Sequence, residues 1–210
     1  MIVIGAGGFA TEVLEILIES YDINEIYFFD DVNNLSSDLL FNRYKILTSL
    51  DQVKEIFNTI SNKYCIGLGG IKNKIKLTEI FNSIGGELTS VISKNAIIGK
   101  HNVSIGRGSV ILPGVKISNN VRIGVLNLIY YNCVIAHDCF IDDYCEISPS
   151  VNILGNVIIG KRVWCGTNCT ILPKLIITDD VIIGAGALVN KSIEIKSTVA
   201  GVPAKEINSI

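Results

Sequence analysis

The sequence has no excess of either charge and few charged residues in all. Lysine and arginine number 18, aspartate and glutamate number 20, and the net charge is −2 in a chain of 210 residues. Charged residues make up only 18 % of the chain. A surface without surplus positive charge argues against a protein that neutralises the phosphate backbone of a nucleic acid. We therefore expect no nucleic-acid partner.

Long apolar runs are also absent, although apolar residues make up 49 % of the chain and its mean hydropathy is +0.45. Polar residues or glycine interrupt every apolar stretch well before the roughly 18 residues that a membrane-spanning helix needs. Residues 1–5 contain neither the basic stretch nor the small-residue cleavage site of a secretory signal. We expect a cytoplasmic protein without membrane insertion.

Metal-binding and redox motifs are missing as well. The six cysteines include no Cys-x-x-Cys pair, and the only histidines are His101 and His137. Zinc enzymes of the carbonic anhydrase type hold the metal through three histidines, one more than this sequence contains. We therefore predict no metal site.

A period of six residues governs the second half of the chain. From Ile105 to Val189, every sixth residue is isoleucine in thirteen of fifteen cases, and the residues two positions earlier are nearly all small or β-branched. Neither the strand period nor the helical period keeps one face in register at this spacing. A hexapeptide repeat is typical of a parallel β-helix, and fifteen hexads at three per coil predict about five coils.

The repeat also predicts the places of cysteine and glycine. Five cysteines fall on inward positions, where a free thiol serves as a small apolar side chain: Cys133, Cys139, Cys145, Cys165 and Cys169. Five glycines directly follow the inward residue, where we expect a tight turn or a positive φ: Gly106, Gly124, Gly160, Gly166 and Gly184.

The first 90 residues lack the repeat and alternate between strand and helix patterns. Residues 2–4, 26–29 and 64–68 read as strands, and residues 11–19 and 71–82 as helices. This alternation predicts a small parallel sheet, half of a Rossmann fold, with ligands bound at the carboxyl ends of the strands. We expect two domains, a ligand-binding α/β domain at 1–90 and a β-helix with a C-terminal tail at 91–210.

A glycine turn follows the first predicted strand. Gly5-x-Gly7-x-x-Ala10 fits the dinucleotide fingerprint, with Asp30 near the place of its ribose-binding acid. A complete dinucleotide site needs a second half-domain, however, and the hexads begin by about residue 95. A nucleotide diphosphate at the helix N-terminus is therefore favoured over NAD. The alternative is that these glycines only form a tight turn.

The two histidines differ in context. His101 lies where the six-residue register slips by one, between Ile98 and Ile105, so we expect it in a loose turn without a function. His137 comes two residues after the inward Ile135, which predicts an outward position at a corner of the β-helix. The acid that follows it, Asp138, can fix the imidazole tautomer and raise its basicity.

These features together resemble those of the bacterial sugar acyltransferases with a left-handed β-helix. The resemblance is carried by the glycine turn, the strand end Phe29-Asp30-Asp31, the hexads, the His137-Asp138 pair and the closing segment 199–207. It covers the whole chain and is greatest for the nucleotide-amino-sugar N-acetyltransferases and the related sialic acid O-acetyltransferases. It implies a left-handed coil, an exception to the usual right-handed crossover.

The resemblance further implies an activity and an assembly. The protein would be a homotrimer with active sites between neighbouring β-helices, acting in bacterial surface-glycan biosynthesis. Acetyl-CoA would be the donor, and the amine of a nucleotide-activated amino sugar the acceptor. Two alternatives remain open: a sialic acid or other sugar O-acetyltransferase, and a non-catalytic scaffold or nucleotide-sugar-binding protein.

The resemblance assigns roles to individual residues. His137 would be the general base, Asp138 the acid that orients it, and the amide of Gly155 the donor to the developing oxyanion. Coenzyme A would pass Glu146, Thr167 and Ala185. The nucleotide sugar would be held by Gly7, Gly8, Phe9, Asp30, Asp31 and Gly69. Relatives usually carry histidine at the place of Phe9, and the enzyme of the bacillosamine pathway carries one at the place of Glu146. The identity of the acceptor therefore does not transfer with the fold.

Overall fold

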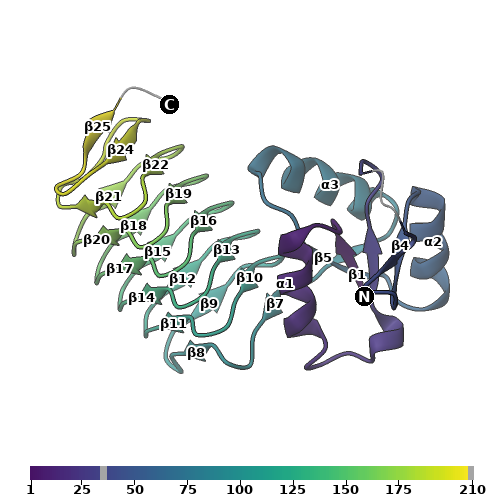
Figure 1. The fold of residues 1–210 in the computed structure, drawn as a ribbon. Helices are drawn as coiled ribbons and strands as arrows, with labels where there is room; N and C mark the ends of the chain where they lie inside the picture. The colour runs from purple at the N-terminus through teal and green to yellow at the C-terminus, as the bar shows by residue number, and fades with distance from the viewer. Residues whose placement is uncertain (34–36, 208–210) are drawn as a thin grey trace. The chain divides into compact units, whose positions relative to one another are not determined.

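The computed structural model describes residues 1–33 and 37–207 and divides the chain into two compact units, Met1–Val91 and Ile92–Ile210 (Figure 1). None of the helices in the described ranges is long and apolar enough to cross a membrane.

The first unit is a six-stranded sheet with helices. The strands follow the order β3-β4-β2-β1-β5-β6, and all neighbours are parallel except β3 and β4. The strands are β1 Ile2–Ile4, β2 Tyr27–Phe29, β3 Leu39–Leu40, β4 Tyr44–Leu47, β5 Lys63–Ile66 and β6 Glu87–Leu88. The helices are α1 Gly8–Leu17, the 3-10 turn η1 Ile23–Glu25, α2 Leu50–Thr59 and α3 Ile71–Ser83. The predicted small parallel sheet is confirmed, and β3, β4, β6 and α2 are additions to it.

Apolar packing holds this unit together. Every residue of β1 is buried, and α1 covers the sheet with its apolar side, including Val13 and Leu14. Phe29, Phe57, Tyr64 and Phe81 form a cluster of rings, and the Tyr64 hydroxyl donates to Asn82 Oδ1 at 2.7 Å. These contacts fix the strand ends, from which the loops of the unit project.

The second unit is a β-helix of two-residue strands. Each strand pairs in parallel with the strand three hexads further along, as Leu128 does with Glu146 and Glu146 with Trp164. Three hexads therefore make one coil, and the left-handed β-helix that the repeat and the resemblance predict is confirmed. We call its three sheets the first (β25-β24-β22-β19-β16-β13-β10-β7), the second (β23-β20-β17-β14-β11-β8) and the third (β21-β18-β15-β12-β9).

The strands of this unit fall on the hexads. They are β7 Val91–Ile92, β8 Ile97–Ile98, β9 Ser104–Ile105, β10 Val110–Ile111, β11 Lys116–Ile117, β12 Arg122–Ile123, β13 Leu128–Ile129, β14 Val134–Ile135, β15 Phe140–Ile141, β16 Glu146–Ile147, β17 Asn152–Ile153, β18 Ile158–Ile159, β19 Trp164–Cys165, β20 Thr170–Ile171, β21 Ile176–Ile177, β22 Ile182–Ile183, β23 Leu188–Val189, β24 Thr198–Ala200 and β25 Lys205–Ile207. The last two form an antiparallel pair.

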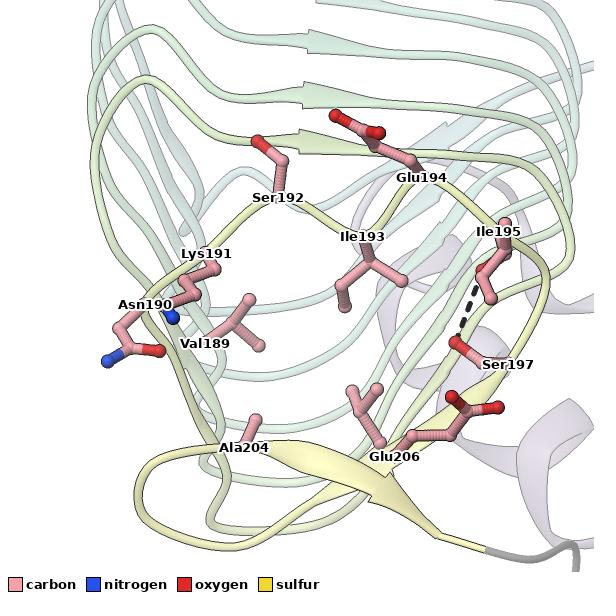
Figure 2. Close-up of a pocket in the computed structure, with 11 residues that line it drawn as sticks. Val189, Asn190, Lys191, Ser192, Ile193, Glu194, Ile195, Ser197, Ala204 and Glu206 are labelled. Carbon is pink, nitrogen blue, oxygen red and sulfur yellow. Dashed lines mark hydrogen bonds between the residues drawn. The ribbon is translucent and has the colours of Figure 1, made fainter.

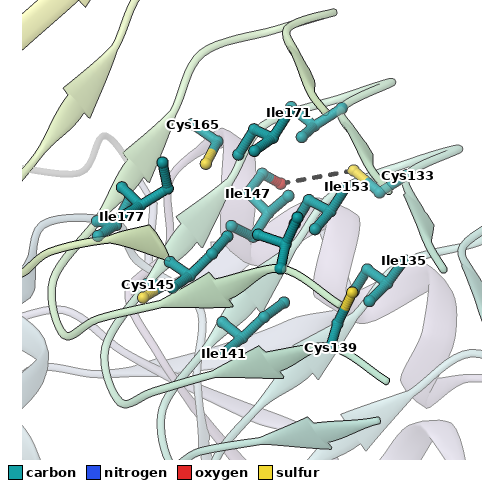
Figure 3. Packing of buried hydrophobic residues seen from close by; sticks show 14 of the residues in the cluster. Cys133, Ile135, Cys139, Ile141, Cys145, Ile147, Ile153, Cys165, Ile171 and Ile177 are labelled. Atoms are coloured by element: carbon teal, nitrogen blue, oxygen red, sulfur yellow. Dashed lines mark hydrogen bonds between the residues drawn. The ribbon is translucent and has the colours of Figure 1, made fainter. Parts of the chain in front are cut away.

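The core of the β-helix is the stacked isoleucines together with cysteine and valine (Figure 3). All six cysteines are free and buried, so the inward placement of the five in the repeat is confirmed. Cys133, Cys139 and Cys145 also donate from Sγ to carbonyl oxygens 15 residues further along, those of Ser148, Leu154 and Gly160, at 3.0–3.1 Å. Each thiol thus satisfies a corner carbonyl besides filling space.

The corners of the β-helix share one backbone conformation. The third residue after each inward position has φ between +54° and +77°, from Gly108 to Gly186 at every sixth residue. Of the two alternatives expected at Gly106 and its equivalents, the positive φ is wrong, because it lies two residues later. The turn itself is present and begins directly after these glycines. Those glycines lack a side chain for another reason: a Cβ on Gly106 would lie 2.3 Å from the carbonyl oxygen of Gly124, one coil further on.

The first coil contains one extra residue, as the sequence predicts. Ile97 pairs with Lys116, one residue beyond the usual three hexads, while Ser104 pairs with Arg122 in the usual register. The extra residue falls in the exposed turn that contains His101.

Candidate functional site

A histidine and an aspartate form a pair at one corner of the β-helix. His137 and Asp138 follow β14 and precede β15, and their side chains are 61 % and 42 % exposed. His137 Nδ1 lies 2.6 Å from Asp138 Oδ2. Asp138 has the left-handed conformation, with φ +60°, which brings the side chains of sequence neighbours together. The predicted outward corner position of His137 is confirmed.

The electrostatics of the pair define the roles of the two imidazole nitrogens. The hydrogen bond with His137, and then one from Asn120, lowers the pKa of Asp138 below its ordinary value. An ionised carboxylate only accepts hydrogen bonds, so Nδ1 carries the proton of the neutral ring. Nε2 is left with its lone pair and has no partner among the described residues. The pair can therefore act as a general base through Nε2.

Gly155 lies against this imidazole, one coil further along. A Cβ built on Gly155 would be 2.7 Å from Cε1 and 2.8 Å from Nε2 of His137. The equivalent places on other corners hold Val125, Asp143 and Lys161, so the backbone there accepts a side chain. The ring of His137 is thus what requires glycine at 155. In the described part of the chain, the Gly155 N–H has no hydrogen-bond partner, as an oxyanion donor requires.

The residues expected along coenzyme A lie elsewhere on the same unit. Thr167 and Ala185 are exposed at the corner between the first and second sheets, whereas His137 stands between the second and third. Glu146 lies on the outer side of the first sheet. Beside it, the half-exposed Trp164 donates from Nε1 to Ser148 Oγ at 3.0 Å. Sequence reasoning missed Trp164, although a tryptophan at an outward hexad position was a readable signal.

A cavity of about 550 Å³ opens in the first unit at the carboxyl ends of β1, β2 and β5. Five of the six predicted residues line it, namely Gly7, Gly8, Phe9, Asp30 and Asp31. Gly69 does not, because β5 ends at Ile66 and the next two residues, Gly67 and Leu68, face the cavity instead. Sequence reasoning also missed Asn33, Asn73 and Lys76, which line the cavity from the β2 loop and from α3.

The glycine turn places the N-terminus of α1 at this cavity. Gly7 is the N-cap of α1 and offers no side chain to the first-turn amides. A Cβ on Gly7 or Gly8 would meet nothing within 4 Å, so both face open space. The amides of the first helical turn and the positive end of the helix dipole favour an anion there.

Asp30 organises the rim of the cavity. Its carboxylate accepts from the amides of Ala6, Val32 and Asn33 at 3.0–3.3 Å and from Asn33 Nδ2 at 2.9 Å. Burial opposes ionisation, but these hydrogen bonds outweigh it and lower the pKa of Asp30. Asp30 therefore joins its loop to the glycine turn, and the exposed Asp31 is the acid with a side chain open to a ligand.

A smaller cavity of about 220 Å³ lies at the C-terminal end of the β-helix (Figure 2). Ile193 points into it, above Val189, Ala204 and the β24–β25 pair. None of the predicted site residues lines it. This cavity lies where the apolar core of the β-helix ends.

Stacked parallel sheets with three hexads per coil, and a base paired with an acid at an exposed corner, define the class of hexapeptide-repeat acyltransferases. Residues 1–81 match the PglD N-terminal domain. Over 186 residues, the chain is 28 % identical to the GDP-perosamine N-acetyltransferase of Escherichia coli O157:H7, covering 88 % of this chain and 82 % of that protein. Other curated relatives match over stretches that cover 33 % and 53 % of their own lengths.

Solved structures resemble the chain over its whole length. WeeI from Acinetobacter baumannii AYE has a TM-score of 0.88 at 29 % identity, and the acetyltransferase domain of PglB from Neisseria gonorrhoeae FA1090 has 0.85 at 26 %. Each comparison covers 98 % of both chains. Over its whole length the chain is therefore similar to hexapeptide-repeat sugar acetyltransferases, with an N-terminal domain of the PglD type.

Proposed function

We propose that this protein transfers the acetyl group of acetyl-CoA to the amine of a nucleotide-linked amino sugar, with His137 as the general base. The observation that carries the proposal is the exposed His137-Asp138 pair with Gly155 against its ring. The GDP-perosamine N-acetyltransferase and the PglB domain, a structure of which is known in complex with acetyl coenzyme A, support the choice of acceptor and donor.

The geometry supports a short mechanism. As the sugar amine attacks the thioester carbonyl, His137 Nε2 accepts the proton that the nitrogen loses. The tetrahedral adduct then collapses, its carbon–sulfur bond breaks, and CoA leaves as a thiolate that takes up the proton from His137. Asp138 keeps Nδ1 protonated and so keeps Nε2 available. General-base help of this kind increases rates by about 10² to 10⁴. The Gly155 N–H would donate to the oxygen of the tetrahedral adduct, and a single such donor is worth roughly 10² to 10³ in kcat.

The cavity of the first unit supports binding of the nucleotide part. A diphosphate would lie at the N-terminus of α1, against the amides that follow Gly7. Lys76, on α3, adds a cation to the same cavity. Asp31 offers a carboxylate that can accept hydrogen bonds from a ribose hydroxyl or from a base edge.

We also propose a homotrimer that acts in the cytoplasm. Thr167, Ala185 and Glu146 belong to a corner and a face of the β-helix that do not contain His137. A coenzyme that contacts these residues and also reaches His137 would lie between two copies of the chain. The assembly is therefore part of the proposed site, and a solution mass of three chains is the expected result.

The test is release of free CoA from acetyl-CoA with a panel of UDP-, GDP- and dTDP-linked amino sugars, each beside its hydroxyl counterpart and beside free sialic acid. We expect turnover with one amino sugar and a fall of at least about a hundredfold in His137→Ala, with His101→Ala as the matched control. Turnover only with hydroxyl acceptors would make the protein an O-acetyltransferase. Binding of a nucleotide sugar without turnover would make it a binding protein.

A further inference from the structure

A ladder of side-chain hydrogen bonds runs up to the His137 corner from the two coils that precede it. Asn102, Asn120 and Asp138 stand one coil apart from each other at the corner between the second and third sheets, and all have positive φ. Asn102 Nδ2 donates to Asn120 Oδ1 at 3.0 Å, and Asn120 Nδ2 donates to Asp138 Oδ1 at 3.0 Å. The ladder ends at the oxygen of Asp138 that does not face the imidazole.

The two oxygens of Asp138 are therefore divided between two partners. Oδ1 takes the amide of Asn120, and Oδ2 takes His137 Nδ1 at 2.6 Å. A carboxylate turns easily about its last side-chain bond, and this one is exposed to water. The bond from Asn120 restricts that rotation. The orientation of the Asn120 side-chain amide is also defined. The Asp138 carboxylate can only accept a hydrogen bond, so Nδ2 of Asn120 must face it, and Oδ1 of Asn120 then accepts from Nδ2 of Asn102.

The turn conformation alone does not explain asparagine at position 120. Asparagine tolerates positive φ better than most residues. Equivalent corner positions nevertheless hold Leu126, Tyr144, Arg162 and Lys174 with nearly the same φ. The backbone therefore accepts many side chains there, whereas the bond to Asp138 needs a donor of the length of asparagine.

We propose that Asn120 is a positioning residue for acetyl transfer: it holds the carboxylate of Asp138 so that Oδ2 keeps the proton of His137 on Nδ1. The proposal rests on the proposed function, in which His137 is the base. Asn120 touches neither substrate nor the reacting atoms in this role, and Asn102 supports it from one coil further away.

The kinetic test compares Asn120→Gly with Asn132→Gly, an asparagine with φ +59° on another corner of the same unit. Glycine keeps the turn and removes only the side chain. We expect Asn120→Gly to lower kcat roughly threefold to thirtyfold with KM for both substrates unchanged, and Asn132→Gly to keep wild-type kcat. In an Asp138→Ala background the effect of Asn120→Gly should vanish, because the residue acts through Asp138. An undiminished effect there, or wild-type kcat in Asn120→Gly, would overturn the proposal.

A second measurement does not depend on activity. The chain has only two histidines, so nitrogen NMR of the imidazoles reports on His137, with His101 as an internal reference. We expect the Nδ1–H tautomer for neutral His137 in the wild type, a mixture in Asn120→Gly, and no change in Asn132→Gly. An unchanged tautomer in Asn120→Gly would refute the positioning role. If the wild type transfers no acetyl group but the tautomer changes as expected, the proposed function fails, and Asn120 is shown to hold Asp138 and the His137 tautomer without a role in acetyl transfer.

Discussion

Replacing Gly155 with alanine should separate the chemistry of the His137 corner from its stability. The added methyl carbon would lie 2.7–2.8 Å from two atoms of the imidazole and 3.3 Å from a third, Nδ1. Carbon atoms in contact normally lie about 3.5 to 4.0 Å apart, so the ring must move by roughly 1 Å. The N–H of residue 155 is unchanged by the substitution.

We expect Gly155→Ala to lower kcat rather than the stability of the fold. His137 is largely exposed, so its ring can swing into solvent without disturbing the core. That movement breaks the 2.6 Å contact with Asp138 and displaces Nε2. A displacement of about 1 Å at a reacting group costs on the order of 10² in rate. We therefore expect kcat to fall about a hundredfold. The melting temperature should stay unchanged within about two degrees, because the exposed imidazole, and not the core around the buried Gly155, moves to make room.

The assay is CoA release together with thermal unfolding, in four proteins: the wild type, Gly155→Ala, His137→Ala and the double variant. Because the three atoms nearest to the added methyl group all belong to the imidazole, adding Gly155→Ala to His137→Ala should change neither quantity further. Retention of more than a third of wild-type kcat in Gly155→Ala would refute the reasoning. A large loss of stability in the double variant would show that the backbone, and not the ring, requires glycine.

Three further outcomes follow from the structure. Lys76→Ala should raise KM for the nucleotide sugar roughly tenfold and leave KM for acetyl-CoA unchanged in initial-rate assays, since Lys76 lines only the cavity of the first unit. Gly67→Ala, whose methyl would lie 2.5 Å from Val3 Cγ1, should cost about 1 to 3 kcal/mol in urea unfolding, while Gly7→Ala, with open space around it, should cost little; equal costs would contradict the packing argument. Burial raises the pKa of the Cys65 thiol to about 12 and that of Cys133 to about 11, from 9.0. As the pH rises, these thiols therefore lose their protons in the unfolded state before they do so in the folded state, which favours unfolding. The free energy of unfolding should fall above pH 9 by up to about 1.4 kcal/mol per pH unit for each thiol. A urea midpoint that stays constant between pH 8 and pH 10 would exclude this effect.

The β-helix was predictable because one interaction repeats through it. Each strand pairs with the strand three hexads further along, so a single inward position recurs at every sixth residue. That period predicts which cysteines are buried and that His137 projects from a corner. The same period would also have placed Gly155 against His137, since the two stand one coil apart at the same corner. The sequence argument assigned only the N–H of Gly155 and missed the space that the ring needs.

The first unit was less predictable because its signals are short. β4 spans only Tyr44–Leu47, which is too short for a sustained period. The apolar residues of α2 do recur at helical spacing, as Leu50, Val53 and Ile56 show, but this signal was not used. A capping signal was present: Ser49 Oγ accepts from the amide of Gln52, and Gln52 Oε1 accepts from the amide of Thr48. The role of Asp30 could not be predicted, because its four donors come from two loops that meet only in the folded sheet.

The corners of the β-helix show what separates a structural turn from a functional one. At the corner between the third and first sheets, Arg162 donates from Nε and Nη2 to both oxygens of Asp180 at 2.8 and 2.9 Å, which lowers the pKa of that carboxyl. Both charges are paired within the stack, and the corner stabilises the coils. At the His137 corner the same stacking ends in a ring with two nitrogens, and Asp138 takes only one of them. The second nitrogen faces outward without a partner in the described chain, so this corner can exchange a proton with a bound substrate.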